Sequence, residues 1–319
     1  NGTQFSTACS LSSLFDSWNL LLNSIVISSI TTDAIMGSTS PLLEKIHKLR
    51  GQKGQIFVAQ KMRELIQGSV IRESHREDDE RVQDPYCIRC QPQVLGACFD
   101  VLRMSANTLE IEANAVTDNP LVLIEENSIV SGGNFHGEPI GFAADNIALS
   151  IAEMGSISQR RVALMVDPSL NFNLPPFLTN HPGLNSGFMV AEVTTAALMS
   201  ENKHLANPCV TDSTPTSANQ EDHVSMSAHA AYRLFKMNKN LSFIFAIELI
   251  CACQGIDSRL PLLTSKKLQE AIKILRVKIP RLENDRYLSK DINLASEIID
   301  KGYLLSKLNL NLPISCLLD

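Results

Sequence analysis

The stretch IGFAADNIALSIAEMGSISQRRVALMV, residues 140–166, decides the fold class. Its apolar side chains recur at helical spacing and spread around much of the helix circumference. They include Phe142, Ile147, Leu149, Ile151 and Met154. A helix that is apolar on all sides is stable only when other elements surround it. The stretch therefore predicts a long helix inside a bundle, with any remaining apolar face covered by a second subunit.

Other segments of the chain have the same helical period and exceptional length. They are residues 11–36, 94–116, 187–205 and 221–253, and strand patterns between them are few. After residue 256 the pattern becomes shorter and more amphipathic, with helices expected near 267–277 and 291–301. We therefore predict an all-α protein, with a central bundle over residues 1–256 and peripheral helices over residues 257–319. The chain is expected to form a homo-oligomer.

Composition excludes several classes of protein. Hydrophobic residues make up 44% and charged residues 19% of the chain, which is a globular balance. The formal net charge of -6 argues against a nucleic-acid partner, because phosphate binding requires a clustered basic face. The apolar segment 20–36 contains seven polar residues, too many for a membrane span, so it is interpreted as a core helix.

Cysteine usage indicates a reducing compartment. Most of the eight cysteines lie within apolar runs, and no signal-peptide pattern opens the chain, so we expect reduced thiols in a cytoplasmic protein. Cys87 and Cys90 form a C-x-x-C motif without a second ligand pair at zinc-finger spacing. We therefore interpret them as small buried hydrophobic residues rather than as metal ligands.

Residues 83–93, QDPYCIRCQPQ, contain a candidate anion site. Asp84 before Pro85 is typical of a helix N-cap followed by proline at the first helical position, which places Tyr86 and Arg89 near the opening turn. Free backbone N–H groups and an arginine fork at a helix start bind carboxylates. The alternative, which local spacing favours, is that Arg89 pairs with a structural acid and Tyr86 packs as an ordinary aromatic residue. The mixed-charge run at 72–81 is predicted to be a solvated surface segment.

Residues 214–223, TPTSANQEDH, contain a second candidate site ahead of a long apolar helix. Ser217 and Gln220 fit a capping box, which would make Gln220 a cap and Glu221 and Asp222 first-turn acids. The functional alternative is that Glu221 contacts a cationic or hydrogen-bonding substrate ring or moves a proton. Local sequence does not favour this second interpretation.

Known catalytic motifs of other enzyme classes are missing from the sequence. The seven histidines are scattered, with no H-E-x-x-H motif and no pair at i, i+4 spacing, so no metal is expected. Neither a dinucleotide fingerprint nor a phosphate loop occurs. The glycine-rich residues 132–137 are not accompanied by a G-x-S-x-G elbow, which argues against serine hydrolysis.

Taken together, segments in order along the whole chain resemble the histidine ammonia-lyase branch of the aromatic amino acid ammonia-lyases. They are residues 1–4 (NGTQ), 83–93, 117–120 (TDNP), 132–139, 183–189 and 217–226. The resemblance implies the helical fold of the ammonia-lyase and fumarase-like superfamily. It also implies a homotetramer whose sites draw residues from several subunits, and elimination of ammonia from L-histidine to give urocanate. The order Gln-Glu-Asp-His at 220–223 resembles the histidine enzymes more than the phenylalanine enzymes.

The resemblance also implies which residues bind the acid group of the substrate. Asn1 and Arg89 would hold the substrate carboxylate. Asn119 and Gln83 would support that end through hydrogen bonds.

The other residues carried over by the resemblance surround the reacting centre. The family's electrophile is 4-methylidene-imidazol-5-one, which forms when an internal Ala-Ser-Gly cyclises and loses water. Tyr86 would lie beside this electrophile and move a proton, and Phe135 would pack against the electrophile or the substrate. Glu221 with Gln220 would line the region of the leaving amine and the imidazole ring.

The chain departs from the family pattern at the electrophile. Ser-Gly occurs at 131–132 and 186–187, but no Ala-Ser-Gly occurs in the sequence, so the prosthetic group is not encoded here. We therefore expect a fragment that is inactive without a separate N-terminal part. Two alternatives remain open. One is a phenylalanine or tyrosine ammonia-lyase or an aminomutase of the same family, and the other is a non-catalytic helical scaffold subunit.

Overall fold

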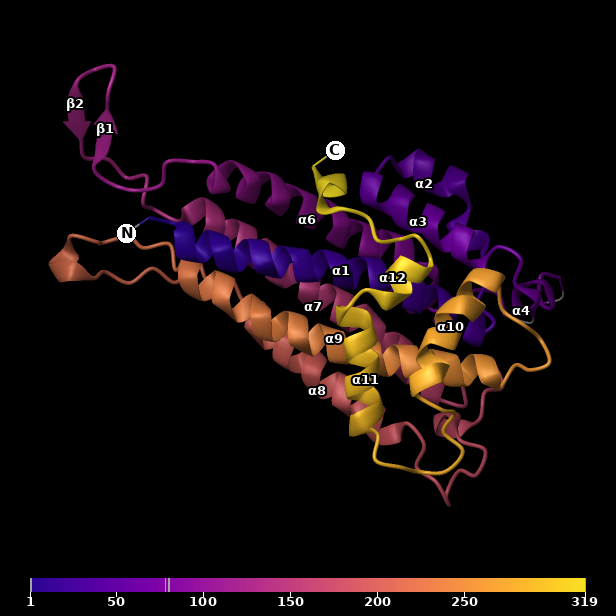
Figure 1. The fold of residues 1–319 in the computed structure, drawn as a ribbon. Coiled ribbons are helices and arrows are strands. Elements are labelled where there is room, and N and C mark those ends of the chain that lie inside the picture. Colours follow the sequence, from indigo (N-terminus) through magenta and orange to yellow (C-terminus); the bar gives the residue numbers. More distant parts are fainter. Residues whose placement is uncertain (1, 78, 80, 319) are drawn as a thin grey trace.

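The computed structural model describes residues 2–77, 79 and 81–318. Long helices dominate this part of the chain and confirm the predicted all-α bundle (Figure 1). Their bounds are Gln4–Ala34 for α1, Gln91–Ala113 for α6, Glu138–Val166 for α7, Met189–Leu205 for α8 and Ser227–Asp257 for α9. The strands of the described residues are β1 (Leu121–Leu123) and β2 (Ser128–Val130), which pair antiparallel.

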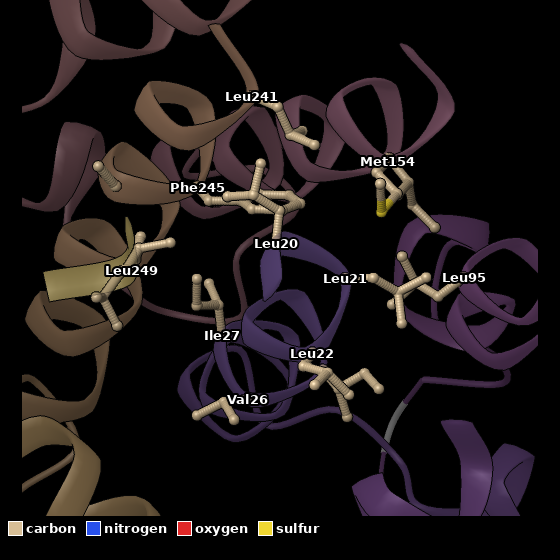
Figure 2. Close-up of a cluster of buried hydrophobic side chains, with 14 of the residues drawn as sticks. Leu20, Leu21, Leu22, Val26, Ile27, Leu95, Met154, Leu241, Phe245 and Leu249 are labelled. Carbon is tan, nitrogen blue, oxygen red and sulfur yellow. The ribbon is translucent and has the colours of Figure 1, made fainter. Parts of the chain in front are cut away.

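Helix α1 lies at the centre of the bundle, where it packs against α9, α7 and α6. Its consecutive residues Leu20, Leu21 and Leu22 are all buried, although successive side chains of a helix point about 100° apart. Figure 2 shows Leu20 beside Phe245 of α9, whereas Leu21 points toward Met154 of α7. Burial on all sides is the arrangement predicted for a helix whose apolar residues are spread around its circumference.

Shorter helices cover the bundle. They are η1 (Ser40–Leu42), α2 (Glu44–Arg50), α3 (Lys53–Ile66), α4 (Val70–Glu73), α5 (Tyr86–Arg89), η2 (Pro176–Leu178), η3 (Ser217–Asn219), α10 (Lys266–Lys278), α11 (Ser289–Asp300), α12 (Tyr303–Lys307) and η4 (Ile314–Leu317). Helix α11 packs on α9 and α1, and Leu268, Ile298 and Leu304 belong to the same hydrophobic cluster as the bundle. The boundary predicted between residues 256 and 257 falls at the last residue of α9, and the division into two domains stays a prediction.

The prediction that residues 72–81 form a solvated surface segment is wrong in part. This outcome concerns the residues of the run that the structure describes. Arg72 and His75 are buried, because they contact residues 37–39, which follow α1. Arg72 Nε donates to Thr39 Oγ1 at 3.0 Å, and His75 Nδ1 lies 2.8 Å from the Ile71 carbonyl oxygen. Arg76 is exposed and pairs with Glu73, as expected for a surface residue. Residues 78 and 80 lie outside the described residues.

All eight cysteines are free thiols. Burial raises the pKa of Cys98 and of Cys253 to about 12, so these side chains stay protonated at neutral pH. Five of the eight cysteines are buried, whereas Cys87 and Cys90, which were predicted to be buried, are only partly so.

Among the described residues, α9 is the helix long and apolar enough to cross a membrane by length and composition. Its most apolar window is 89% buried against the rest of the molecule. Packing at the centre of a bundle therefore accounts for its composition.

Helices α3 and α6 approach each other closely at Gly54 and Gly96. A Cβ on Gly96 would lie 2.3 Å from the backbone nitrogen of Gln55, where no flexible side chain can move away. We expect Gly96→Ala to lower the free energy of unfolding by about 1 to 3 kcal/mol, because the two helices must separate. Urea denaturation measures this change. Gly133→Ala is the matched control, because a Cβ there meets nothing within 4 Å, and an equal loss in both variants would contradict the prediction.

Candidate active site

A cavity of about 760 Å³ opens at the end of the bundle where α1 begins. Figure 1 shows that the β1–β2 hairpin and the loop between α8 and α9 both project beyond this end. Four of the predicted site residues line the cavity, namely Asn119, Phe135, Gln220 and Glu221. The remaining lining residues are Ser131, Gly132, His136, Gly137, Asp222, His223, Val224 and Ser225.

The hairpin side of the cavity is held by Asn119. Its side-chain oxygen accepts hydrogen bonds from Ser131 Oγ at 3.0 Å and from the Gly132 backbone nitrogen at 2.7 Å. These bonds close the base of the hairpin, so the amide N–H groups of Asn119 remain as donors for a ligand. Phe135 follows the hairpin and is 39% exposed, which leaves its ring available to a bound molecule.

The loop side of the cavity is built around Glu221. Thr216 Oγ1 donates to Glu221 Oε2 at 2.7 Å, and the backbone groups of the two residues pair with each other. The three residues Ser217, Ala218 and Asn219 between them have positive φ angles of 50°, 56° and 68°. Left-handed backbone in non-glycine residues is strained and is retained where the surrounding contacts hold it. Glu221 therefore occupies a defined position although it is exposed.

The capping-box prediction for this segment is wrong. Helix α9 begins at Ser227, and Ser217 makes no capping hydrogen bond because residues 217–219 form a tight turn. Gln220 and Glu221 are consequently loop residues that face the cavity rather than first-turn residues of a helix. The functional alternative for Glu221 is the interpretation that this geometry favours.

A buried ion pair anchors the same loop to the bundle. Asp145 of α7 contacts Arg233 of α9, and both side chains are about 95% buried. Asp145 Oδ2 also accepts from the backbone nitrogens of Cys209 and Val210 at 2.9 and 3.1 Å. The loop is therefore attached at its beginning to two helices of the bundle, which limits its movement at the cavity.

The predicted residues Gln83, Tyr86 and Arg89 lie near the other end of the bundle. Arg89 Nε donates to the carbonyl oxygen of Asp84 at 3.1 Å, and its guanidinium lies 4.8 Å above the Tyr86 ring. Among the described residues no acidic side chain forms an ion pair with Arg89, so the structural alternative for this arginine lacks its partner. Tyr86 is 71% exposed, and Gln83 is exposed in the preceding loop.

The predicted N-cap at Asp84 is wrong. Pro85 occupies the cap position of the four-residue helix α5, and no side chain caps it. Asp84 is instead buried, where Oδ2 accepts from the Ser38 backbone nitrogen at 2.6 Å and Oδ1 lies 3.2 Å from Arg81. Asp84 therefore ties this segment to the end of α1.

Within one chain, the predicted site residues that line the cavity lie far from those near Arg89. Asp84 contacts Ser38, beyond the end of α1, whereas Thr117, close to Asn119, contacts Thr3 just before α1 begins. A helix of 31 residues such as α1 is about 45 Å long, so most of that length separates the groups. Asn1 lies outside the described residues.

Sequence reasoning missed a cluster of three polar residues, of which His136 and His223 line the cavity and Glu138 adjoins it. His136, Glu138 and His223 place their ligand atoms within 4.8 Å of one another. The first two lie in the quoted segment 132–139 and the third in 217–226, but no spacing rule connects segments 87 positions apart.

Comparison with solved structures defines the class of protein. Histidine ammonia-lyase from Trypanosoma cruzi matches with a TM-score of 0.91 and 38% identity, over 100% of this chain and 60% of that one. Tyrosine aminomutase from Streptomyces globisporus matches with a TM-score of 0.90 and 31% identity, over 98% of this chain and 63% of that one. The molecule therefore has the helical ammonia-lyase fold, with polar site loops at the ends of the bundle.

Sequence comparison then identifies the family. The profile of the aromatic amino acid lyase family matches residues 1–277, and a curated histidine ammonia-lyase from Roseobacter denitrificans is 63% identical over 304 residues. The chain belongs to the aromatic amino acid lyase family. The alignment covers 95% of this chain and 59% of that relative, so the chain spans about three fifths of the length of the curated protein.

Proposed function

We propose that this chain serves in a histidine ammonia-lyase, which eliminates ammonia from L-histidine to give urocanate in histidine degradation. The observation that carries this proposal is the 63% identity with the Roseobacter denitrificans histidine ammonia-lyase. The sequence Gln-Glu-Asp-His at 220–223, which lines the cavity, supports the choice of histidine over phenylalanine or tyrosine. A cytoplasmic location, also proposed, agrees with eight free cysteines.

The active site is proposed to form between subunits of a homotetramer. The support is geometric, because Tyr86 and Arg89 lie near one end of the bundle and Phe135 and Glu221 at the other. A second copy that packs alongside in the opposite direction would place one end against the other. Large apolar side chains remain exposed on the long helices, as expected of surfaces that a subunit covers. They include Phe142, Leu149, Val190 and Val193.

The substrate carboxylate is proposed to bind at Arg89. The guanidinium can donate two parallel hydrogen bonds to a carboxylate, and its terminal nitrogens make no hydrogen bond or ion pair within residues 2–77, 79 and 81–318. Asn119 supplies amide N–H donors from the cavity of the neighbouring subunit, since its oxygen already binds the hairpin. Gln83 and Asn1 would complete this end of the site.

The reacting centre is proposed to lie against Phe135. The family's 4-methylidene-imidazol-5-one supplies an electron sink that makes the amine a better leaving group. The 319 residues contain no Ala-Ser-Gly from which that group could form, so it would have to come from another segment or chain. The exposed Phe135 ring offers it an apolar neighbour, and the exposed Tyr86 hydroxyl can hold or move a proton.

Glu221 is proposed to accept a hydrogen bond from the substrate amine or imidazole, together with Gln220. The Thr216 hydroxyl, 2.7 Å away, leaves the second carboxylate oxygen of Glu221 available for this contact. Because this acceptor is already held at the cavity wall, no rearrangement of the protein is needed to position the leaving nitrogen during the reaction.

The test is substrate turnover in a complemented assembly. The chain is co-expressed with the part of the Roseobacter denitrificans relative that it does not span, and ammonia release from histidine, phenylalanine and tyrosine is measured. We expect release from histidine with formation of urocanate, and little from the other two amino acids. Release from phenylalanine or tyrosine alone would overturn the substrate, and an assembled complex inactive on all three would favour the scaffold alternative.

A further inference from the structure

Three side chains with metal-binding chemistry meet beside the cavity, and two of them line it. His136 lies between the hairpin and α7, Glu138 is the first residue of α7, and His223 lies in the loop before α9. One ligand atom from each lies within 4.8 Å of the other two. Because His223 lies 87 positions from His136 in the sequence, only folding brings it to the other two residues, which is why the sequence predicted no metal.

The hydrogen bonds of His136 determine which of its nitrogens carries a lone pair. Nε2 lies 3.2 Å from the His223 carbonyl oxygen, and a carbonyl only accepts, so Nε2 carries the proton in this contact. In the neutral ring Nδ1 is then an acceptor. It faces Glu138 Oε2 at a distance of 4.0 Å. Two acceptors that face each other repel unless a cation lies between them.

Glu138 provides the second observation. Its Oε2 atom is shielded from solvent and has no hydrogen-bond partner among the described residues. A shielded carboxylate oxygen without a donor costs free energy in the protein, and a cation removes that cost. The His223 ring lies 5.6 Å from the His136 ring, close enough for a second imidazole nitrogen to reach the same point.

We propose that His136, Glu138 and His223 bind one divalent cation of the zinc class. Two imidazole nitrogens and one carboxylate oxygen form a ligand set that Zn²⁺ favours over Mg²⁺ or Ca²⁺. With bonds of about 2.1 Å, tetrahedral ligands lie about 3.4 Å apart, so the side chains must close in by about 1 Å. The bond from His136 to a backbone carbonyl is the contact that fixes the second nitrogen of metal-binding histidines.

The site has an open position toward the cavity. The three residues all line it or adjoin its lining, and three protein ligands leave one tetrahedral position for water or another small ligand. This inference concerns cation binding by the chain's own residues and does not depend on the proposed lyase activity.

Isothermal titration of the untagged protein with ZnCl₂ tests the proposal, and Co²⁺ absorption in the visible range reports the coordination geometry. We expect one equivalent to bind, with a tetrahedral cobalt spectrum, and MgCl₂ to give no heat. Glu138→Gln and His136→Gln should each weaken zinc binding about 100-fold, since each removes one ligand. His204→Gln, which alters an exposed histidine of α8, should bind zinc as the unmodified protein does.

Two results would overturn the proposal. One is zinc affinity that is equal in the unmodified protein and in His136→Gln, and the other is no zinc binding at all. Circular dichroism confirms that each variant folds. Glu138 is partly buried, so Glu138→Gln could unfold. In that case His223→Asn, at an exposed position, replaces it in the zinc titration. Because the titration measures zinc binding directly, a failure to bind zinc can be distinguished from a failure to release ammonia.

Discussion

Arg89→Ala is expected to reduce kcat/KM for histidine by a factor that corresponds to about 2 to 4 kcal/mol in the active assembly. The substitution removes a charge-assisted, two-point contact with the substrate carboxylate. Most of the loss should appear as a higher KM, because the carboxylate is bound in both the ground state and the transition state. Steady-state kinetics of urocanate formation measure both parameters. Arg50→Ala, at the exposed end of α2, is the control and should leave them unchanged.

The distance between Arg89 and Glu221 makes a sharper version of this experiment possible. If each site takes Arg89 from one subunit and Glu221 from another, two inactive variants can complement each other. Co-expression of Arg89→Ala with Glu221→Ala should then leave about a quarter of the sites with both residues intact, given random mixing of subunits. Unrestored activity in demonstrably mixed oligomers would mean that the two residues serve the same chain or that one of them has no role.

Glu248→Ala is expected to lower the free energy of unfolding by about 3 to 5 kcal/mol, because it leaves the Arg161 cation buried without a counter-ion. Both side chains are completely buried, between α7 and α9. Glu248 Oε1 accepts from Arg161 Nε at 2.6 Å and from Thr31 Oγ1 at 2.7 Å. Its other oxygen accepts from Arg161 and from Ser158 Oγ at 2.5 Å. One carboxylate therefore links α1, α7 and α9 at the core of the bundle.

Urea denaturation of matched variants separates the charge effect from the loss of volume. The double variant Arg161→Met with Glu248→Met removes both charges and keeps apolar volume, so it should be more stable than Glu248→Ala. Glu297→Ala is the control, because it breaks an exposed ion pair with Lys301 and should leave the unfolding midpoint almost unchanged. A Glu248→Ala protein as stable as the unmodified chain would show that this pair does not hold the helices together.

Helix content and the inside of the bundle followed from the sequence alone. The apolar residues of 140–166 predicted a helix surrounded by others, and α7 extends over Glu138–Val166 with Ile147 and Met154 completely buried. Hydrophobic periodicity is a local property of the chain, so the sequence of one helix indicates which of its faces are buried. Family membership was equally accessible, because the motifs that carry it are contiguous in sequence.

Helix ends were less predictable than helix interiors. Ser217 and Asp84 both fit local capping patterns, yet the first lies in a strained turn and the second is buried against the end of α1. Arg72 and His75 looked like part of a solvated charged run and proved to be buried. For Asp84, Arg72 and His75, contacts with distant segments outweigh the local preference, which for a helix cap is worth about 1 kcal/mol.

Sequence by itself determined the class of fold, the family and the segments that carry chemistry, since all of these depend on short-range patterns. Only the tertiary structure decided where those segments lie. It placed Arg89 and Glu221 toward opposite ends of a bundle about 45 Å long, and it joined His136 with His223 across 87 positions. The physical reason is that packing of long helices, rather than any local preference, sets the distance between residues far apart in the chain.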